Sequence, residues 1–159
     1  MNAHDILKYG NITFQHSLSA IPKEEWDTQG VCGWWTVKNI VAHLASYELV
    51  LVDVFCSFIQ SGETPQLHQY LTTRTFNDDQ VNVRRAKTPD DTIAEYTTAH
   101  EKVMTLVGQI APEKLREVGT LPWYGAEYAL DDYLVYAFYG HKREHSAQID
   151  VFKDKLQAK

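Results

Sequence analysis

Four long stretches of the sequence repeat apolar residues every three or four positions, and no stretch alternates apolar and polar residues convincingly enough to be a strand. The expected helices cover residues 2–20, 36–60, 88–110 and 131–156. Helices of this length, joined partly by long connections, are typical of a four-helix bundle with at least one crossover. The sequence therefore predicts an all-α fold.

Capping residues mark two of these helix starts. Thr36 is a good N-cap for the second helix, and Thr88 is followed by a proline and, three positions after the cap, by Asp91. The segment 63–87 between these helices lacks strong periodicity, although a short helix could begin at Phe76. Connections of this length are usually crossovers or functional elements.

The composition is that of an ordinary globular protein and disfavours several classes of function. The chain has 159 residues, 44% of them apolar and 23% charged, which predicts one domain spanning residues 1–159. A net charge of -6, with no basic cluster longer than residues 84–87, disfavours a nucleic-acid partner. Asp53 interrupts the longest apolar run and the N-terminus lacks a signal-like pattern, so we expect no membrane span and a cytoplasmic location. The two cysteines lie outside any CxxC motif, which argues against a disulfide framework or a thiolate zinc site.

Two histidines of the last predicted helix, His141 and His145, are four positions apart and project from the same side of that helix. That side coincides with the apolar stripe, whereas we expect Lys142 to project toward the other, polar side. His43 lies near the edge of the buried stripe of the second helix. Three neutral imidazoles that converge inside a bundle could hold a divalent zinc, nickel or iron ion.

Histidines that face an apolar core also have a simpler interpretation, in which each one bonds to a buried polar group. A lone histidine such as His43, or His100 in the third helix, fits this interpretation on spacing alone. The pair in the last helix fits it less well, because two imidazoles would need two separate polar partners in a dry interior. On spacing, a metal site and a core role both stay open.

The string His-Lys-Arg-Glu-His matches the inverted zinc-peptidase motif H-x-x-E-H, in which the glutamate acts as a base. Those enzymes take a further carboxylate ligand downstream, and only Asp150 and Asp154, with no glutamate, follow His145 here. We therefore reject a peptidase. Glu144 lies about 60° away from His141 around the helix axis, so we expect it to be exposed or to orient an imidazole from outside the ligand set.

Aromatic residues gather in two of the predicted loops, close to helix starts. Trp35, Trp123 and Tyr124 could wall a pocket over the open side of an ion. Loop aromatics also staple helix ends, so this alternative stays open.

Three segments, taken in order, carry a family resemblance. They are the stretch 35–44, which contains His43, the residues Phe76-Asn77 with Arg84-Arg85 and Thr88-Pro89, and the pair His141 and His145 with Glu144. Together they resemble the DinB/YfiT-like superfamily of metal-dependent bacterial proteins. The resemblance implies a four-helix bundle with up-down-down-up connectivity in which His43, His141 and His145 bind one divalent ion. Three neutral ligands leave the +2 charge uncompensated, which lowers the pKa of a bound water or thiol.

Relatives in that superfamily include thiol-dependent isomerases and S-transferases that use bacillithiol or mycothiol, and self-resistance proteins. We therefore expect a metal-dependent hydrolase or a thiol-dependent S-transferase that acts on a small molecule and could draw on a low-molecular-weight thiol. The alternatives are a non-catalytic stress or resistance protein that sequesters a small molecule around a structural ion, and a metal-free interaction bundle. The relatives also imply a homodimer. The mycothiol-dependent maleylpyruvate isomerases of the superfamily have an additional C-terminal domain that this chain lacks, so we do not expect that specific reaction.

Overall fold

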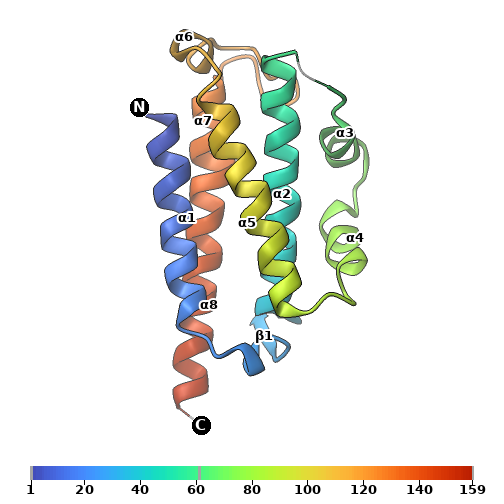
Figure 1. Cartoon of the computed structure of the whole chain (residues 1–159), viewed down its shortest axis with the longest axis vertical. Coiled ribbons are helices and arrows are strands. Elements are labelled where there is room, and N and C mark those ends of the chain that lie inside the picture. Colours follow the sequence, from blue (N-terminus) through green and yellow to red (C-terminus); the bar gives the residue numbers. More distant parts are fainter. Residues whose placement is uncertain (1, 61, 159) are drawn as a thin grey trace.

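Four long helices lie side by side and form the body of the computed structural model, which describes residues 2–60 and 62–158 (Figure 1). They are α1 (Ala3–Ser19), α2 (Val37–Phe58), α5 (Pro89–Val107) and a C-terminal helix made of α7 (Leu130–Leu134), the π-helical turn η2 (Val135–Gly140) and α8 (His141–Gln157). α1 and the C-terminal helix run in one direction, and α2 and α5 run in the other (Figure 1). This order confirms the predicted all-α bundle with up-down-down-up connectivity.

Because α2 and α5 are parallel, the chain has to return along the bundle between them. Two short helices make this crossover, α3 (Pro65–Thr72) and α4 (Phe76–Val83), and they lie along one side of the bundle (Figure 1). The Oδ2 atom of Asp53 on α2 accepts hydrogen bonds from the backbone N–H groups of Gln66 at 2.6 Å and Leu67 at 3.0 Å, which holds the start of α3. The helix predicted from Phe76 is confirmed, whereas the pattern in segment 63–87 gives no sign of α3.

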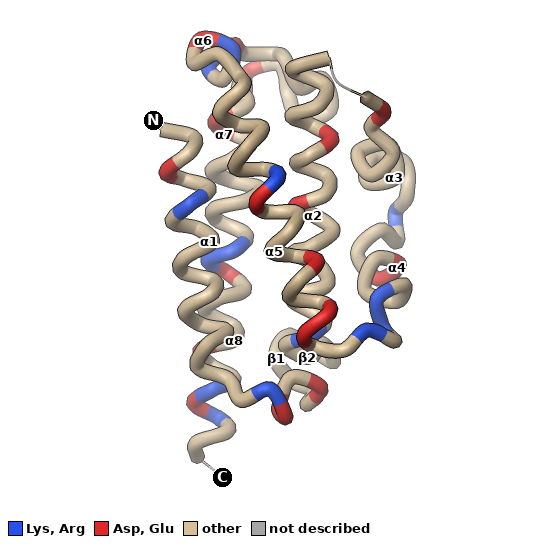
Figure 2. The backbone as a smooth tube through the Cα atoms, in the orientation of Figure 1, with Lys and Arg blue, Asp and Glu red and all other residues tan. Residues whose placement is uncertain are grey.

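Basic residues attach the end of this crossover to α5. Arg84 donates to Glu95 Oε1 through Nε at 3.0 Å and through its terminal nitrogen at 2.7 Å, and Lys87 pairs with the other oxygen of the same carboxylate. The basic residues lie near the lower end of α4, close to the start of α5 (Figure 2). This contact fixes the crossover at the end of the bundle where α5 begins.

A small hairpin contradicts the prediction that the chain forms no strand. It pairs β1 (Gln29–Cys32) with β2 (Trp35–Thr36) in antiparallel fashion, and it follows the short 3₁₀ helix η1 (Lys23–Glu25). Gly30 and Gly33 adopt φ values of 105° and 58°, a region that glycine tolerates, and strands this short cannot show an alternation in the sequence. The hairpin ends at Thr36, whose side chain accepts from the backbone N–H of Asn39, so the predicted cap of α2 is confirmed.

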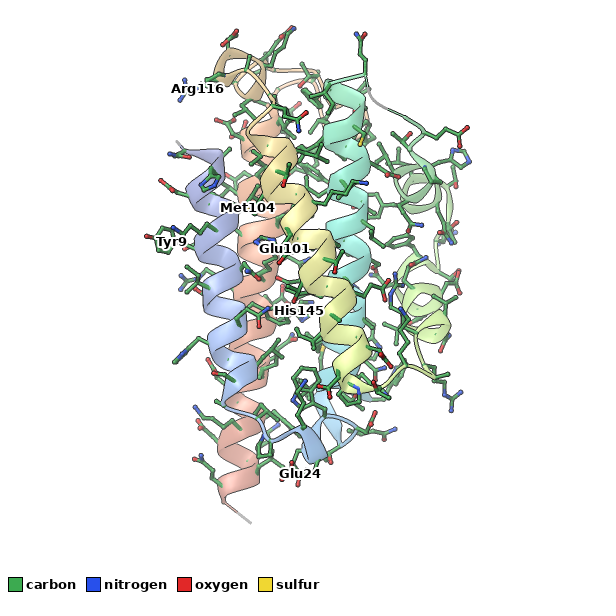
Figure 3. All side chains as sticks on the ribbon, viewed as in Figure 1. Tyr9, Glu24, Glu101, Met104, Arg116 and His145 are labelled. Carbon is green, nitrogen blue, oxygen red and sulfur yellow. The ribbon has the colours of Figure 1, made fainter. Side chains whose placement is uncertain are left out.

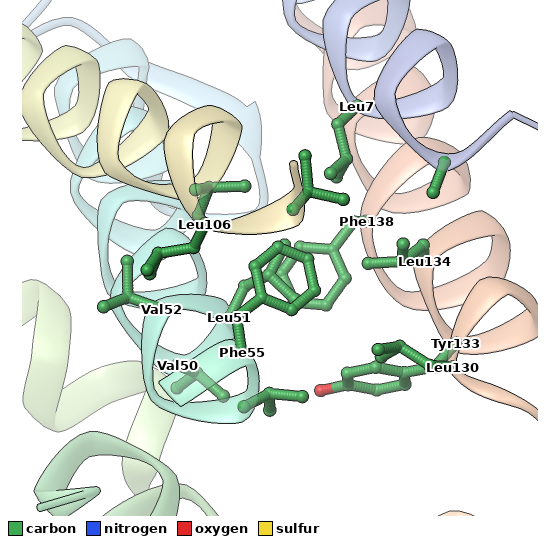
Figure 4. Close-up of a cluster of buried hydrophobic side chains, with 14 of the residues drawn as sticks. Leu7, Val50, Leu51, Val52, Phe55, Leu106, Leu130, Tyr133, Leu134 and Phe138 are labelled. Carbon is green, nitrogen blue, oxygen red and sulfur yellow. The ribbon is translucent and has the colours of Figure 1, made fainter. Parts of the chain in front are cut away.

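The apolar core is built around α2. In the upper half of the bundle its side chains pack against those of α5 and the C-terminal helix, among them Leu51, Phe55, Leu106, Leu134 and Phe138 (Figure 4). α2 is the one described helix that is long and apolar enough to cross a membrane, with a mean hydropathy of 1.6 in its 18-residue window. That window is 78% buried inside the protein, as in the core helix of a soluble protein.

A network of ionisable side chains lies buried in the middle of the bundle. Glu48 of α2 is fully buried, and its carboxylate lies 2.7 Å from Nζ of Lys142 on α8 and 2.8 Å from Nδ1 of His100 on α5. The expectation that Lys142 projects to the polar side is therefore wrong, because its side chain is 1% exposed. His100 is a core histidine, as its spacing suggested, and its ring stacks at 6.2 Å on that of Tyr96.

The network exists because each charge offsets the cost of burying the other. Burial would raise the pKa of the Glu48 carboxyl, but Lys142 and His100 outweigh this effect and hold that pKa below its usual range. The contact with Lys142 is an ion pair without the alignment of a hydrogen bond, so it depends on charge. One carboxylate thus joins three of the four long helices.

Glu48→Gln should destabilise the protein strongly, because it leaves the Lys142 ammonium buried without a counter-charge. We expect a loss of about 3 kcal/mol or more in the free energy of unfolding, which corresponds to roughly 6–12 °C in melting temperature. Glu117→Gln, which removes a carboxylate from an exposed pair with Lys114, is the matched control and should leave the melting temperature unchanged. Equal melting curves for the two variants would contradict the role given to the network.

Candidate metal centre

The three histidines singled out in the sequence meet at one point inside the bundle. Nε2 of His141 lies 2.9 Å from Nε2 of His43 and 2.9 Å from Nε2 of His145. All three donor nitrogens lie within 4.8 Å of one another, and within residues 2–60 and 62–158 they are the one group of this kind. Figure 3 shows His145 inside the bundle, about midway along its length. α2 and α8 therefore bring the predicted ligand set together.

Neighbouring acceptors decide which ring nitrogens carry protons. Nδ1 of His145 lies 2.8 Å from Oε1 of Gln148, which can only accept, so this nitrogen donates and Nε2 keeps its lone pair. His141 donates to the backbone carbonyl of Ala137, which leaves its Nε2 unprotonated as well. Two lone pairs that face each other at 2.9 Å repel unless a proton or a cation lies near them. The donor set therefore suits a divalent ion.

Burial keeps the three imidazoles in the form that binds metals. Burial, together with the charges of His141 and His145, lowers the pKa of His43 to about 2. Burial and the nearby His145 and Lys142 lower the pKa of His141 to about 3, and burial also lowers the pKa of His145. Neutral imidazole is the form that coordinates zinc, nickel and iron.

The π-helical turn η2 precedes the first of the two ligands on α8. A π turn holds more residues than an α turn, so it changes the direction in which all later side chains project. Its last residue is Gly140, where a Cβ would lie 3.3 Å from the carbonyl oxygen of Val135, closer than most Cβ contacts. Turns of this type are frequent at functional sites. Here the turn sets the direction of His141 and His145.

Aromatic rings enclose the histidines on the side of α2. The ring of Trp35, at the end of the hairpin, lies 5.0 Å from that of His43, although Trp35 is not among the residues that line the hollow described below. Tyr47 lies one turn after His43, and its ring centroid is 4.7 Å from His43 and 4.6 Å from His141. Burial and the neighbouring Tyr70 raise the pKa of Tyr47 to about 12, so its hydroxyl stays protonated. The sequence interpretation missed Tyr47, although its i+4 spacing from a ligand could have indicated it.

A hollow of about 300 Å³ opens beside His141. Tyrosines from three elements line it, Tyr47 of α2, Tyr70 of α3 and Tyr136 of η2. Glu144, one turn after His141 on α8, completes the wall. This hollow places a space of small-molecule size directly against one of the three donor residues.

The other predicted pocket residues lie away from the histidines. Trp123 is in the loop between α6 (Pro112–Leu115) and α7, and no contact joins it to the three imidazoles among the described residues. The ring of Tyr124 packs on Tyr133, whose own ring contacts Phe138. Glu144 makes no described hydrogen bond to an imidazole, and Gln148 orients His145 instead. The structure thus brings Trp35 and Glu144 to the site, and places Trp123 and Tyr124 elsewhere.

Removal of one ligand should abolish metal binding without unfolding the bundle. We expect near-stoichiometric zinc, nickel or iron in tag-free wild-type protein, and almost none in His43→Ala or His141→Ala, because two imidazoles hold an ion far more weakly than three. Elemental mass spectrometry measures the metal, and circular dichroism checks the helix content. His68→Ala, at an exposed histidine of α3, is the control and should keep its metal. Full metal content in both ligand variants would disprove the site.

The sequence matches the mycothiol maleylpyruvate isomerase N-terminal domain family over residues 13–131, which is more than half of the chain. The match includes His43 and ends before His141 and His145. The assignment of these two histidines to the site therefore rests on the geometry and not on the family match. No curated protein and no solved structure matches the chain. The matched family has the all-α DinB/YfiT-like fold that the bundle shows. The chain therefore belongs to the mycothiol maleylpyruvate isomerase N-terminal domain family, within the DinB/YfiT-like superfamily.

Proposed function

We propose that this protein is a divalent-metal-dependent enzyme that transfers a low-molecular-weight thiol to a small molecule, with hydrolysis as the competing reaction at the same centre. The observation that carries the proposal is the convergence of three neutral imidazole nitrogens beside a hollow of about 300 Å³. His43, His141 and His145 would hold the ion. Zinc, nickel and iron all suit this donor set.

When bound, a divalent ion with three neutral ligands lowers the pKa of a thiol or a water molecule and makes it a better nucleophile. The residues of the chain hold the imidazoles and the substrate in place. Gln148 fixes the tautomer of His145, Tyr47 packs against two of the ligand rings, and the hollow admits the substrate next to His141. These residues prepare the site for a small molecule.

Thiol transfer is favoured over hydrolysis by the family, whose name refers to mycothiol, a thiol. In the transfer, the thiol gives up its proton to solvent, and its sulfur forms a bond to an electrophilic carbon of the substrate. The leaving group departs with the electron pair of the bond that breaks. Hydrolysis would use water in place of the thiol, with the same balance of protons and electrons.

A non-catalytic protein that sequesters a small molecule is the second candidate. It is favoured by the lining of the hollow, which offers no buried general base. Glu144 is the one carboxylate among the described lining residues, and it is exposed to solvent. Such a protein would bind its ligand around a structural ion without turnover. The homodimer expected from the resemblance and the cytoplasmic location expected from the N-terminal sequence stay predictions.

Turnover with a generic thiol and electrophile separates these candidates. Metal-loaded wild type should accelerate the reaction of 2-mercaptoethanol with 1-chloro-2,4-dinitrobenzene, followed by the absorbance of the thioether product. The rate should fall to the uncatalysed level in His141→Ala, and His68→Ala should retain it. Acceleration of p-nitrophenyl acetate hydrolysis alone would favour the hydrolase. No acceleration of either reaction by protein with full metal content would favour sequestration.

A further inference from the structure

We propose that the hollow beside His141 selects small molecules that carry a protonated amine, and that Glu144 is the residue that determines this preference. The inference rests on the proposed function in one respect only, since the other end of the same molecule would reach the metal centre. It assigns a charge class to the ligand, which the family match leaves open.

The first observation is the charge of the wall. Glu144 is the one charged side chain among the described residues that line the hollow, and no lysine or arginine lines it with them. Its carboxylate has no hydrogen-bond or ion-pair partner among the described residues. The preceding residue on the same helix, Arg143, donates instead to the hydroxyl of Tyr139 at 3.1 Å. A ligand in the hollow thus meets a negative charge that no described lysine or arginine pairs with.

The second observation is the chemistry of the other walls. Tyr47 and Tyr70 stand edge to face with their centroids 5.7 Å apart, and Tyr136 is 64% exposed at the opening. The faces of tyrosine rings attract cations, and a carboxylate accepts charge-assisted hydrogen bonds from an ammonium group. An anionic group in the same place would be repelled by Glu144. The hollow is therefore complementary to an ammonium group.

The third observation is the spacing of Glu144 from the metal centre. His141 and Glu144 are three residues apart on one helix, so they lie on the same side, with a rise of about 4.5 Å between them. An ion held by neutral ligands favours an anionic donor such as a thiolate at its open side. A ligand that satisfies both ends carries a donor atom and an amine in one small molecule, as short amino thiols do.

Three thiols of similar size test this preference. Cobalt(II)-loaded protein is titrated with cysteamine, 2-mercaptoethanol and 3-mercaptopropionate, and the sulfur-to-cobalt absorption band reports binding. Because the thiols differ in acidity, the informative quantity is the change in each affinity between wild type and Glu144→Gln. We expect cysteamine to lose about three- to tenfold. 2-Mercaptoethanol should stay unchanged, and 3-mercaptopropionate should gain.

The matched control is Glu127→Gln, which removes an exposed carboxylate from the loop before α7 and should change none of the three affinities. Equal changes for all three thiols in Glu144→Gln would overturn the inference while leaving the metal centre intact. Wild-type protein that fails to bind cobalt would overturn the proposed function instead.

A second measurement keeps the inference testable without any metal. Saturation-transfer NMR on metal-free protein should detect ethylammonium in wild type and show a weaker signal in Glu144→Gln, with ethanol as the neutral comparison. The same ethylammonium signal in both proteins would overturn the inference whatever the outcome with cobalt.

Discussion

The buried ion pair between Glu48 and Lys142 joins the two helices that carry the three converging histidines. Glu48 follows His43 on α2 by five residues, and Lys142 directly follows His141 on α8, so the pair fixes how these helices lie relative to each other. Apolar side chains tolerate exchange for others of similar volume, whereas a charge in a dry interior requires its partner at one position. The convergence of the imidazoles, the shape of the hollow and the place of α5 all depend on this pair, because His100 brings α5 to the same carboxylate.

The parts of the fold that repeat with helical periodicity could be predicted from the sequence, and so could the shared direction of His141 and His145, because residues four apart project from one side of a helix. The grouping of this pair with His43 came from the family resemblance, since spacing alone left a core role open. The burial of Lys142 could not be predicted in the same way. A lysine beside an arginine looks solvated, and only the three-dimensional arrangement supplies Glu48 as its partner from another helix. The hollow was missed for a similar reason, since its tyrosines come from three elements that are far apart in the sequence.

The family match and the geometry support different parts of the site. The match covers His43 and the core helices, which define the superfamily fold, and it stops before the helix that provides the other two ligands. The closeness of the three Nε2 atoms shows that this unmatched helix completes the group. The aromatic surroundings differ from the expected ones in an informative way. Trp35 lies at the site, while the loop that carries Trp123 and Tyr124 connects α6 and α7 at the end of the bundle away from the hairpin (Figure 1).

The π-helical turn at Val135–Gly140 makes the ligand set sensitive to chain length. If the same residues relaxed to an α-helix without loss of a residue, everything that follows would rotate by about 100° while the core contacts of α7 stayed in place. The histidines would then keep their spacing in the sequence and face away from His43. Loss of one residue together with this relaxation would restore their direction, so homologous bundles with a regular helix at this point need one residue fewer there to keep the three histidines together.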